Sequence, residues 1–198
     1  MNRDVIVGIL VATILGGLLG YGVSYATFQP TIQRLQSQDS TFSNMINSLN
    51  QSISETKTAS VIVLLSGKQE VPQVNTSAWG VAFFSLSKNG STLSYTLAVD
   101  NIDQVTMAHI HLAPAPGGVG GVVVWLYPSV PPAVLIPGTS NGAIASGTIT
   151  SANLVGALAG QPFSALLDAL KSGKTYVNVH TDQYPNGEIR GDIIVTSN

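Results

Sequence analysis

Short stretches in which apolar and polar residues alternate constrain the fold of this chain more than any other feature of its sequence. In the stretch 175–181, Val177 and Val179 alternate with Asn178 and His180. A period of two residues is typical of a β-strand with one buried face. We therefore expect a strand here, with the side chain of His180 on the face that points away from the core.

The alternation recurs in the stretch 107–112, where it places two further histidines on one face. His109 and His111 alternate there with alanine, isoleucine and leucine. Two imidazoles that are two residues apart on one strand face lie within reach of a single partner or metal ion. The loop 113–121 that follows is rich in glycine, which allows backbone to approach this face closely. The two strands together hold all 3 histidines of the chain.

Further short stretches with strand character follow one another along the chain, with turn signals between them. The pair Asn89 and Gly90 lies between two of them, and Asn-Gly is the strongest short-range signal for a β-hairpin. A run from Pro162 to Gly173 repeats its apolar residues with helical spacing and indicates one short helix. A shorter helical stretch is expected at 151–158. The expected strands are 61–65, 79–86, 93–99, 105–112, 122–126, 143–149, 175–181 and 188–195.

About eight strands with one short helical insertion predict an all-β fold. Strands of this length and spacing are typical of an antiparallel sandwich or flattened barrel with Greek-key connections. The abundance of Gly, Ser, Thr, Val and Asn agrees with strands and turns rather than long helices.

The composition also excludes several classes of function. Only 9% of the residues are charged and the formal net charge is -2, so we expect no nucleic-acid partner. The chain has 0 cysteines, which excludes disulfides, thiolate metal sites and cysteine nucleophiles. No nucleophile with its base, no phosphate-binding glycine loop and no carboxylate pair of a hydrolase motif is present, so we do not expect an enzyme.

The amino-terminal segment 1–28 is expected to be a membrane anchor. Its run 5–26 is uncharged and mostly apolar, and as a helix it reaches roughly 30 Å, enough to cross a bilayer. A cleaved signal peptide is the alternative, because Ser24, Tyr25 and Ala26 have the small-x-small form of a cleavage site. The apolar run is longer than a typical signal core, which favours a single-pass anchor with the rest of the chain outside the cell. Cleavage would instead give a secreted protein.

The segment 29–57 is polar, with apolar residues that fit one heptad frame. This pattern predicts a coiled-coil stalk through which the chain could form a homo-oligomer. A flexible polar linker is the alternative, because residues of poor helix propensity are frequent here. The apolar positions are Ile32, Leu35, Phe42, Ile46, Leu49 and Ile53.

Four segments of the remaining part, 58–198, resemble in order the successive motifs of the CHRD family, the domain first described in chordin. They are Gly-Lys-Gln-Glu-Val-Pro at 67–72, Ala-His-Ile-His-Leu at 108–112, Gly-Thr-Ile-Thr at 147–150, and Tyr-Val-Asn-Val-His-Thr through Gly-Glu-Ile-Arg-Gly at 176–191. The resemblance implies a secreted or surface-exposed β domain, found in microbes as well as animals. Animal chordin binds growth-factor ligands, so the resemblance also implies a surface binding module with protein partners.

A second, more limited resemblance concerns the histidines. The His-x-His pair and the third histidine on a late strand are similar to three of the four copper ligands of copper/zinc superoxide dismutase, an eight-stranded Greek-key barrel. This resemblance implies that His109, His111 and His180 are metal ligands and that Arg190 is an anion-guiding arginine. Imidazole suits both copper and zinc. The chain lacks a fourth histidine and a His/Asp cluster for zinc, so rapid dismutation is not expected.

A structural role for the histidines is the main alternative to a metal site. In that interpretation the three rings form a hydrogen-bonded cluster with Asn178, Asp182 or Glu188 that joins two strands and a loop. The argument against a structural role is that side chains that face solvent make few packing contacts. Glu188 and Arg190 alternate on one strand face and are expected to form structural ion pairs.

The sequence therefore predicts a membrane-anchored extracellular module that captures copper or zinc. A purely structural or adhesive envelope domain without metal is the first alternative. A degenerate dismutase-like copper oxidoreductase is the second.

Overall fold

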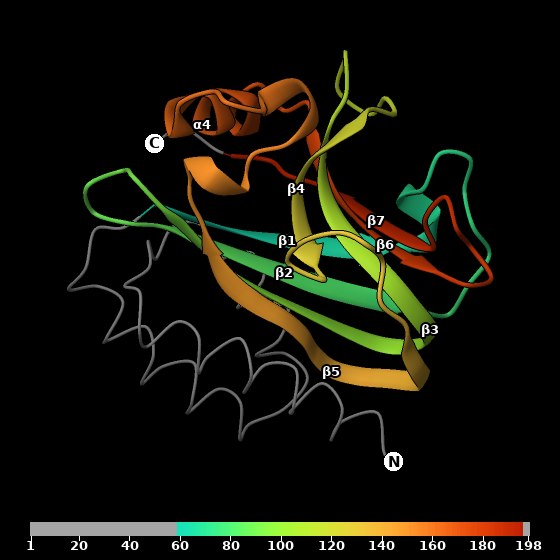
Figure 1. The fold of residues 1–198 in the computed structure, drawn as a ribbon. Helices are drawn as coiled ribbons and strands as arrows, with labels where there is room; N and C mark the ends of the chain where they lie inside the picture. The colour runs from blue at the N-terminus through green and yellow to red at the C-terminus, as the bar shows by residue number, and fades with distance from the viewer. Residues whose placement is uncertain (1–58, 196–198) are drawn as a thin grey trace, which may run out of the picture.

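The computed structural model describes residues 59–195 (Figure 1). The predicted anchor at 1–28 and the predicted stalk at 29–57 lie outside the described residues. Within 59–195, no helix combines the length and the apolar character that a membrane crossing requires.

The described residues form a mostly β structure of seven strands and one α-helix, with three short 3-10 turns. The strands are β1 (Ser60–Ser66), β2 (Trp79–Leu86), β3 (Leu93–Leu112), β4 (Gly121–Tyr127), β5 (Ile136–Ile149), β6 (Thr175–Thr181) and β7 (Ile189–Asp192). The helices are η1 (Gly67–Gln69), η2 (Ser151–Asn153), η3 (Gly156–Leu158) and α4 (Phe163–Lys171). The predicted β fold with a short helical insertion is confirmed.

Five of the strands close into an antiparallel barrel. Hydrogen bonds join them in the order β2, β1, β7, β6 and β3, and β3 then pairs with β2 to complete the ring. β4 and β5 extend this barrel, because each pairs with a different part of β3. Of the two predicted architectures, the structure has the barrel.

β3 is one strand of 20 residues, whereas the sequence predicted two separate strands, 93–99 and 105–112. Its first part pairs with β2 and β5, and its second part pairs with β4 and β6. Asn101 and Gln104 lie between the two parts, and both have a φ of 53°. The β3–β5 register shifts at these positions. Two local irregularities thus interrupt the alternation without ending the strand, which accounts for seven strands in place of eight.

Three other segments differ from the predicted boundaries by more than one residue at an end. β7 ends at Asp192, whereas a strand over 188–195 was predicted. β5 begins at Ile136 rather than at 143, because pairing with β3 supplies hydrogen bonds where the local pattern is weak. The stretch 151–158 forms two 3-10 turns rather than a helix, and a backbone bond from Val155 to Val123 ties it to β4.

The core lies between the inward faces of the barrel strands and α4. Val177 and Val179 of β6 are fully buried in it, as are Ala108 and Ile110 of β3. α4 contributes Leu166 from its apolar face, as its helical spacing predicted. The opposite faces of β3 and β6 are therefore the outer surface of the barrel, and they carry the histidines.

Candidate metal centre

Adjacent strands place the three histidines on one patch of the outer barrel face. β3 and β6 are antiparallel neighbours in which His109 lies opposite Asn178 and His111 lies opposite Tyr176. Residues that face each other across a strand pair project to the same side. His180 follows Asn178 by two residues and therefore shares that side. The predicted orientation of all three side chains, away from the core, is confirmed.

The histidines are nevertheless buried, and the expectation that they face solvent is wrong. The exposed fractions are 2% for His109, 8% for His111 and 6% for His180. The ring of Trp125, from β4, lies edge-on to His109 with the centroids 4.3 Å apart. The ring of Tyr176 stacks on His111 at 4.7 Å. Aromatic neighbours and loops thus cover an outer face that alternation alone marks as solvent-facing.

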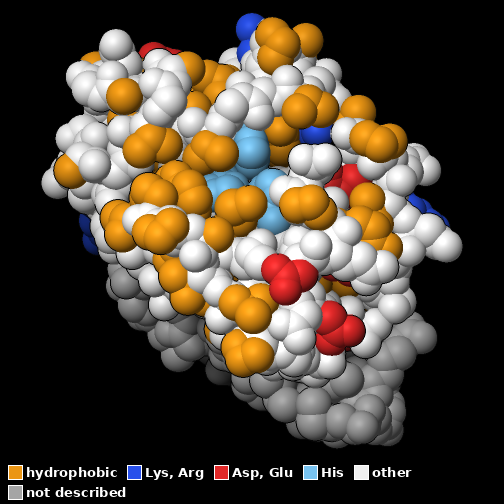
Figure 2. Space-filling model, turned by 45° about the vertical axis from the view of Figure 1, so that its right-hand side comes forward, with side chains coloured by type: hydrophobic (Ala, Val, Ile, Leu, Met, Phe, Trp, Pro, Cys, Tyr) orange, Lys and Arg blue, Asp and Glu red, His pale blue; other side chains and the backbone are white. Residues whose placement is uncertain are grey.

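A narrow approach to the histidines remains open. Figure 2 shows histidine atoms at the bottom of a shallow hollow that hydrophobic side chains border. An ion could reach the imidazoles through this hollow, while the surrounding apolar groups limit access of water.

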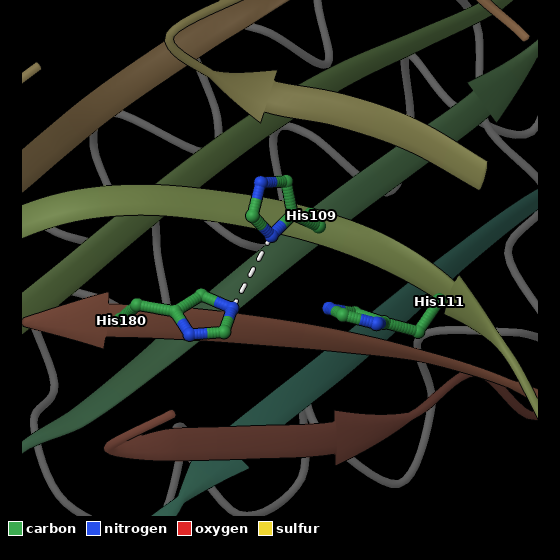
Figure 3. A group of neighbouring side chains, drawn as sticks. All are labelled: His109, His111 and His180. Carbon is green, nitrogen blue, oxygen red and sulfur yellow. Dashed lines mark hydrogen bonds between the residues drawn. The ribbon is translucent and has the colours of Figure 1, made fainter. Parts of the chain in front are cut away.

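Ring nitrogens of the three histidines converge on one small volume (Figure 3). His109 Nδ1 and His180 Nε2 are 3.2 Å apart. One ring nitrogen from each of the three residues lies within 4.8 Å of the other two. Around a metal with bonds of about 2.0–2.1 Å, ligand nitrogens are separated by roughly 3.5 Å. The His109–His180 pair already has that spacing, and a shift of about 1 Å by His111 would complete it.

Hydrogen bonds to backbone carbonyls determine which ring nitrogen carries the lone pair in His111 and in His180. His180 Nδ1 donates to the carbonyl oxygen of Pro185 at 3.0 Å, and His111 Nδ1 donates to that of Gly120, also at 3.0 Å. A carbonyl only accepts hydrogen bonds, so the proton of each neutral ring lies on Nδ1 and the lone pair on Nε2. An outer hydrogen bond of this kind is what orients a metal-bound histidine.

The glycine-rich loop approaches the histidine face as expected. A Cβ atom at Gly120 would collide with the carbonyl group of Leu112, so only glycine fits this position without a shift of the loop. The peptide of Gly120 also contacts the hydroxyl of Tyr176, whose oxygen accepts from the Gly120 N–H at 3.2 Å. Gly120 therefore holds both His111 and the ring stacked on it.

Two imidazole nitrogens have no hydrogen-bond partner within the described part of the chain. They are Nε2 of His109 and Nε2 of His111, and both are buried. The side chains that the sequence offered as partners, Asn178, Asp182 and Glu188, make no hydrogen bond to a histidine in residues 59–195, where carbonyl groups take that role instead. A free lone pair on His111 Nε2 and three imidazole donors fit copper or zinc.

Burial keeps the three rings neutral at physiological pH. It lowers the pKa of His109 to about 3, with further lowering by His180 and His111. It lowers the pKa of His180 to about 4, although the hydrogen bond to Pro185 acts in the opposite direction. Burial also lowers the pKa of His111. Neutral imidazole is the form that binds a metal, so no ring has to lose its positive charge before an ion enters. His109 Nδ1 donates to His180 Nε2, so its proton would have to move to Nε2 of the same ring when a metal binds.

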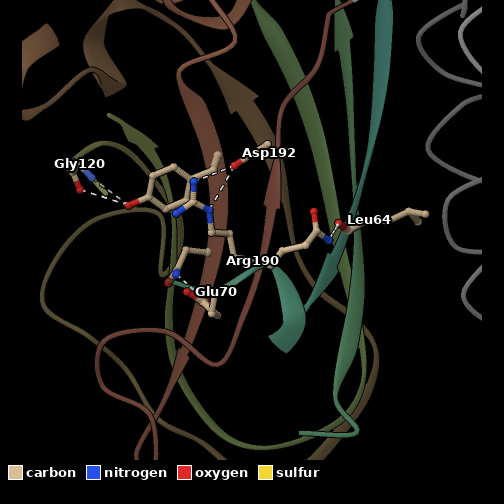
Figure 4. A network of polar contacts seen from close by, with 8 residues as sticks. Leu64, Glu70, Gly120, Arg190 and Asp192 are labelled. Atoms are coloured by element: carbon tan, nitrogen blue, oxygen red, sulfur yellow. Dashed lines mark hydrogen bonds and ion pairs between the residues drawn. The ribbon is translucent and has the colours of Figure 1, made fainter. Parts of the chain in front are cut away.

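Arg190, Asp192 and Glu70 belong to a network of polar contacts (Figure 4). Arg190 also interacts electrostatically with His111. Arg190 is 2% exposed and pairs with Asp192 at 2.8 Å, which confirms its expected ion pair. The expectation is wrong for Glu188, whose carboxylate instead accepts from the hydroxyls of Thr76 and Thr181. The first of these bonds joins the loop after β1 to the turn between β6 and β7, and these two segments lie side by side in Figure 1.

Glu70 is a second buried group of this network, and it connects the loop after β1 to β6. Its carboxyl accepts from the side-chain amide of Asn178 at 2.8 Å. Burial raises the pKa of Glu70 to about 7, although Arg190 and a backbone bond at Val71 act in the opposite direction. The loop residue is therefore close to half-protonated at neutral pH.

A family model for the CHRD domain matches residues 61–193. The chain belongs to the CHRD family. The match spans every strand of the barrel and both histidine segments, so the resemblance found in the sequence is confirmed. No curated protein and no solved structure matches the chain.

Proposed function

We propose that this CHRD domain is an extracellular binding module that captures copper or zinc through His109, His111 and His180. The convergence of three neutral, buried imidazoles carries the proposal. Family membership supports an extracellular type of binding module. The apolar run at 5–26 supports attachment to the cell membrane. The extracellular type of the family supports an outward-facing domain.

The unpartnered nitrogen of His111 favours a metal over a purely structural cluster. A buried polar atom without a partner costs about 1–3 kcal/mol, so a cluster kept for stability alone would be expected to satisfy its nitrogens. Here His111 Nε2 has no hydrogen-bond partner among the described residues. The unpartnered His109 Nε2 lies on the side of its ring away from His180 and does not bear on this choice (Figure 3). A bound ion would engage the lone pair of His111 directly.

A structural or adhesive domain without metal is the second candidate. The bonds from His111 to Gly120 and from His180 to Pro185 favour it, because they tie two loops to the barrel through backbone carbonyls alone. Either role is one of binding or assembly, and we propose no catalytic step for this site.

Calorimetric titration of the full chain in detergent micelles with copper and zinc tests the proposal. We expect one ion per chain for the wild type and no binding for a His109→Ala/His111→Ala double variant. Asp182→Asn is the matched control, because it changes an exposed, solvent-screened side chain that forms no hydrogen bond with the histidines. A folded wild-type chain that takes up neither ion would leave the structural candidate.

A further inference from the structure

The net charge of the ligands affects how tightly a site binds metal ions of different charge. The three potential ligands are neutral imidazoles, and within residues 59–195 no carboxylate belongs to the same group of ligand atoms. Buried ions are normally paired with opposite charges, because the loss of hydration is otherwise too costly. This loss grows with the square of the ionic charge, so it is four times larger for a dication than for a monocation.

A buried cation lies close to the ligand set. The guanidinium carbon of Arg190 is 3.6 Å from the ring centroid of Tyr176. The ring of Tyr176 is in turn stacked on His111, with the two planes 6° apart. One aromatic ring thus separates the guanidinium from a ligand imidazole.

Two carboxyl groups compensate this charge only in part. Glu70 interacts electrostatically with Arg190, but burial raises the pKa of Glu70 to about 7, so this group is only partly ionised at neutral pH. The side chain of Asp192 is 35% exposed, whereas that of Arg190 is 2% exposed. Water therefore screens the carboxylate more than the guanidinium. A metal at the histidines experiences a net repulsion, and the repulsion is twice as large for a dication.

We propose that the site selects monovalent copper, Cu(I), over divalent zinc, and that Arg190 is the residue that sets this selectivity. The inference rests on the proposed function, because it concerns the same three histidines. Imidazole is a suitable ligand for copper, and a monocation in a neutral three-nitrogen site needs no anionic ligand.

The size of the effect follows from the stacked geometry. The two ring contacts place the guanidinium about 8 Å from the His111 ring. At an effective dielectric constant of about 20, one additional unit of metal charge changes the affinity roughly thirtyfold at that separation. Partial compensation by Asp192 and Glu70 reduces this to about tenfold.

Competition titrations of the full chain in detergent micelles test the inference. Cu(I) is measured without oxygen against a Cu(I)-specific chelator, and Zn(II) against a chromophoric zinc chelator. The measured quantity is the ratio of the zinc Kd to the Cu(I) Kd. Arg190→Met removes the charge but keeps an apolar side chain on Tyr176, and Arg190→Lys is the matched control that keeps the charge.

We expect the wild type to bind Cu(I) more tightly than zinc. Arg190→Met should lower the ratio about tenfold, through tighter zinc binding, while Arg190→Lys stays close to the wild type. Asp192→Asn should raise the ratio, because it removes the carboxylate that forms the ion pair with the guanidinium. Asp192→Asn changes a partly exposed side chain and is therefore expected to fold. It tests the role of the Arg190 charge if Arg190→Met does not fold.

The outcomes distinguish the inference from the proposed function. Tighter binding of zinc by the wild type, or the same ratio in the wild type and in the folded charge variants, would overturn the selectivity and leave metal binding intact. Failure of a folded wild-type chain to bind either ion would overturn both.

Discussion

Gly120→Ala is the substitution for which the structure gives the sharpest expectation. The new methyl group would overlap the carbonyl group of Leu112, so the loop must move away from β3. That movement breaks the bond between His111 Nδ1 and the Gly120 carbonyl, and it disturbs the contact with the hydroxyl of Tyr176.

The expected cost has two parts. Overpacking at a close backbone approach costs typically about 1–3 kcal/mol. Loss of the hydrogen bond to His111, a buried donor, adds about 1 kcal/mol. We therefore expect Gly120→Ala to lower the free energy of unfolding by about 2–4 kcal/mol. Because the outer hydrogen bond of a metal-binding histidine is lost, metal affinity should fall by about 10–100-fold.

Gly121→Ala is the matched control, since a Cβ atom at the next residue meets nothing within 4 Å. Chemical denaturation followed by tryptophan fluorescence measures both variants, and both tryptophans of the chain, Trp79 and Trp125, lie in the described domain. The expected result is a large loss for Gly120→Ala and a change below about 0.5 kcal/mol for Gly121→Ala. Equal losses in the two variants would refute the assignment of Gly120 as the support of His111.

Three further predictions concern pH, fluorescence and topology. Because burial raises the pKa of Glu70 from 4.5 to about 7, its contribution to stability is complete below pH 4.5 and is lost as the pH rises through 7. The wild type should therefore lose stability relative to Glu70→Gln over that interval in denaturation curves, and a constant difference would contradict the burial argument. Copper at the histidines should quench Trp125, whose ring is 4.3 Å from that of His109, so Trp125→Phe should abolish most of the quenching and Trp79→Phe should not. Equal quenching in both variants would place the copper elsewhere. Since the chain has 0 cysteines, Gln183→Cys introduces a single exposed thiol. A membrane-impermeant maleimide should label it in intact cells, and labelling only after lysis would contradict an outward-facing domain.

Local periodicity determined most of the secondary structure. The predicted boundaries of β2 and β6 coincide with those in the structure, and α4 begins at Phe163, directly after the proline that marks its first turn. β6 has a repeat of two residues and α4 a repeat of three to four, whereas β2 was located by the hairpin signal of Asn89 and Gly90. β3 was divided in two because Asn101 and Gln104 interrupt the repeat, and only pairing with four neighbouring strands shows that the chain continues.

The sequence likewise predicted one part of the candidate site, and the tertiary structure was needed for the rest. Alternation alone identified His109, His111 and His180 and the face on which they lie. It could not show that their nitrogens converge, because convergence depends on the register between β3 and β6.

Nor does alternation show what covers that face. The carbonyls of Gly120 and Pro185 reach the histidines from loops, and Arg190 reaches Tyr176 from a neighbouring strand. A two-residue alternation of apolar and polar side chains indicates only which side of a strand faces the core. The tertiary structure decided that the other side is buried too, because segments distant in the sequence pack over it and keep its histidines neutral.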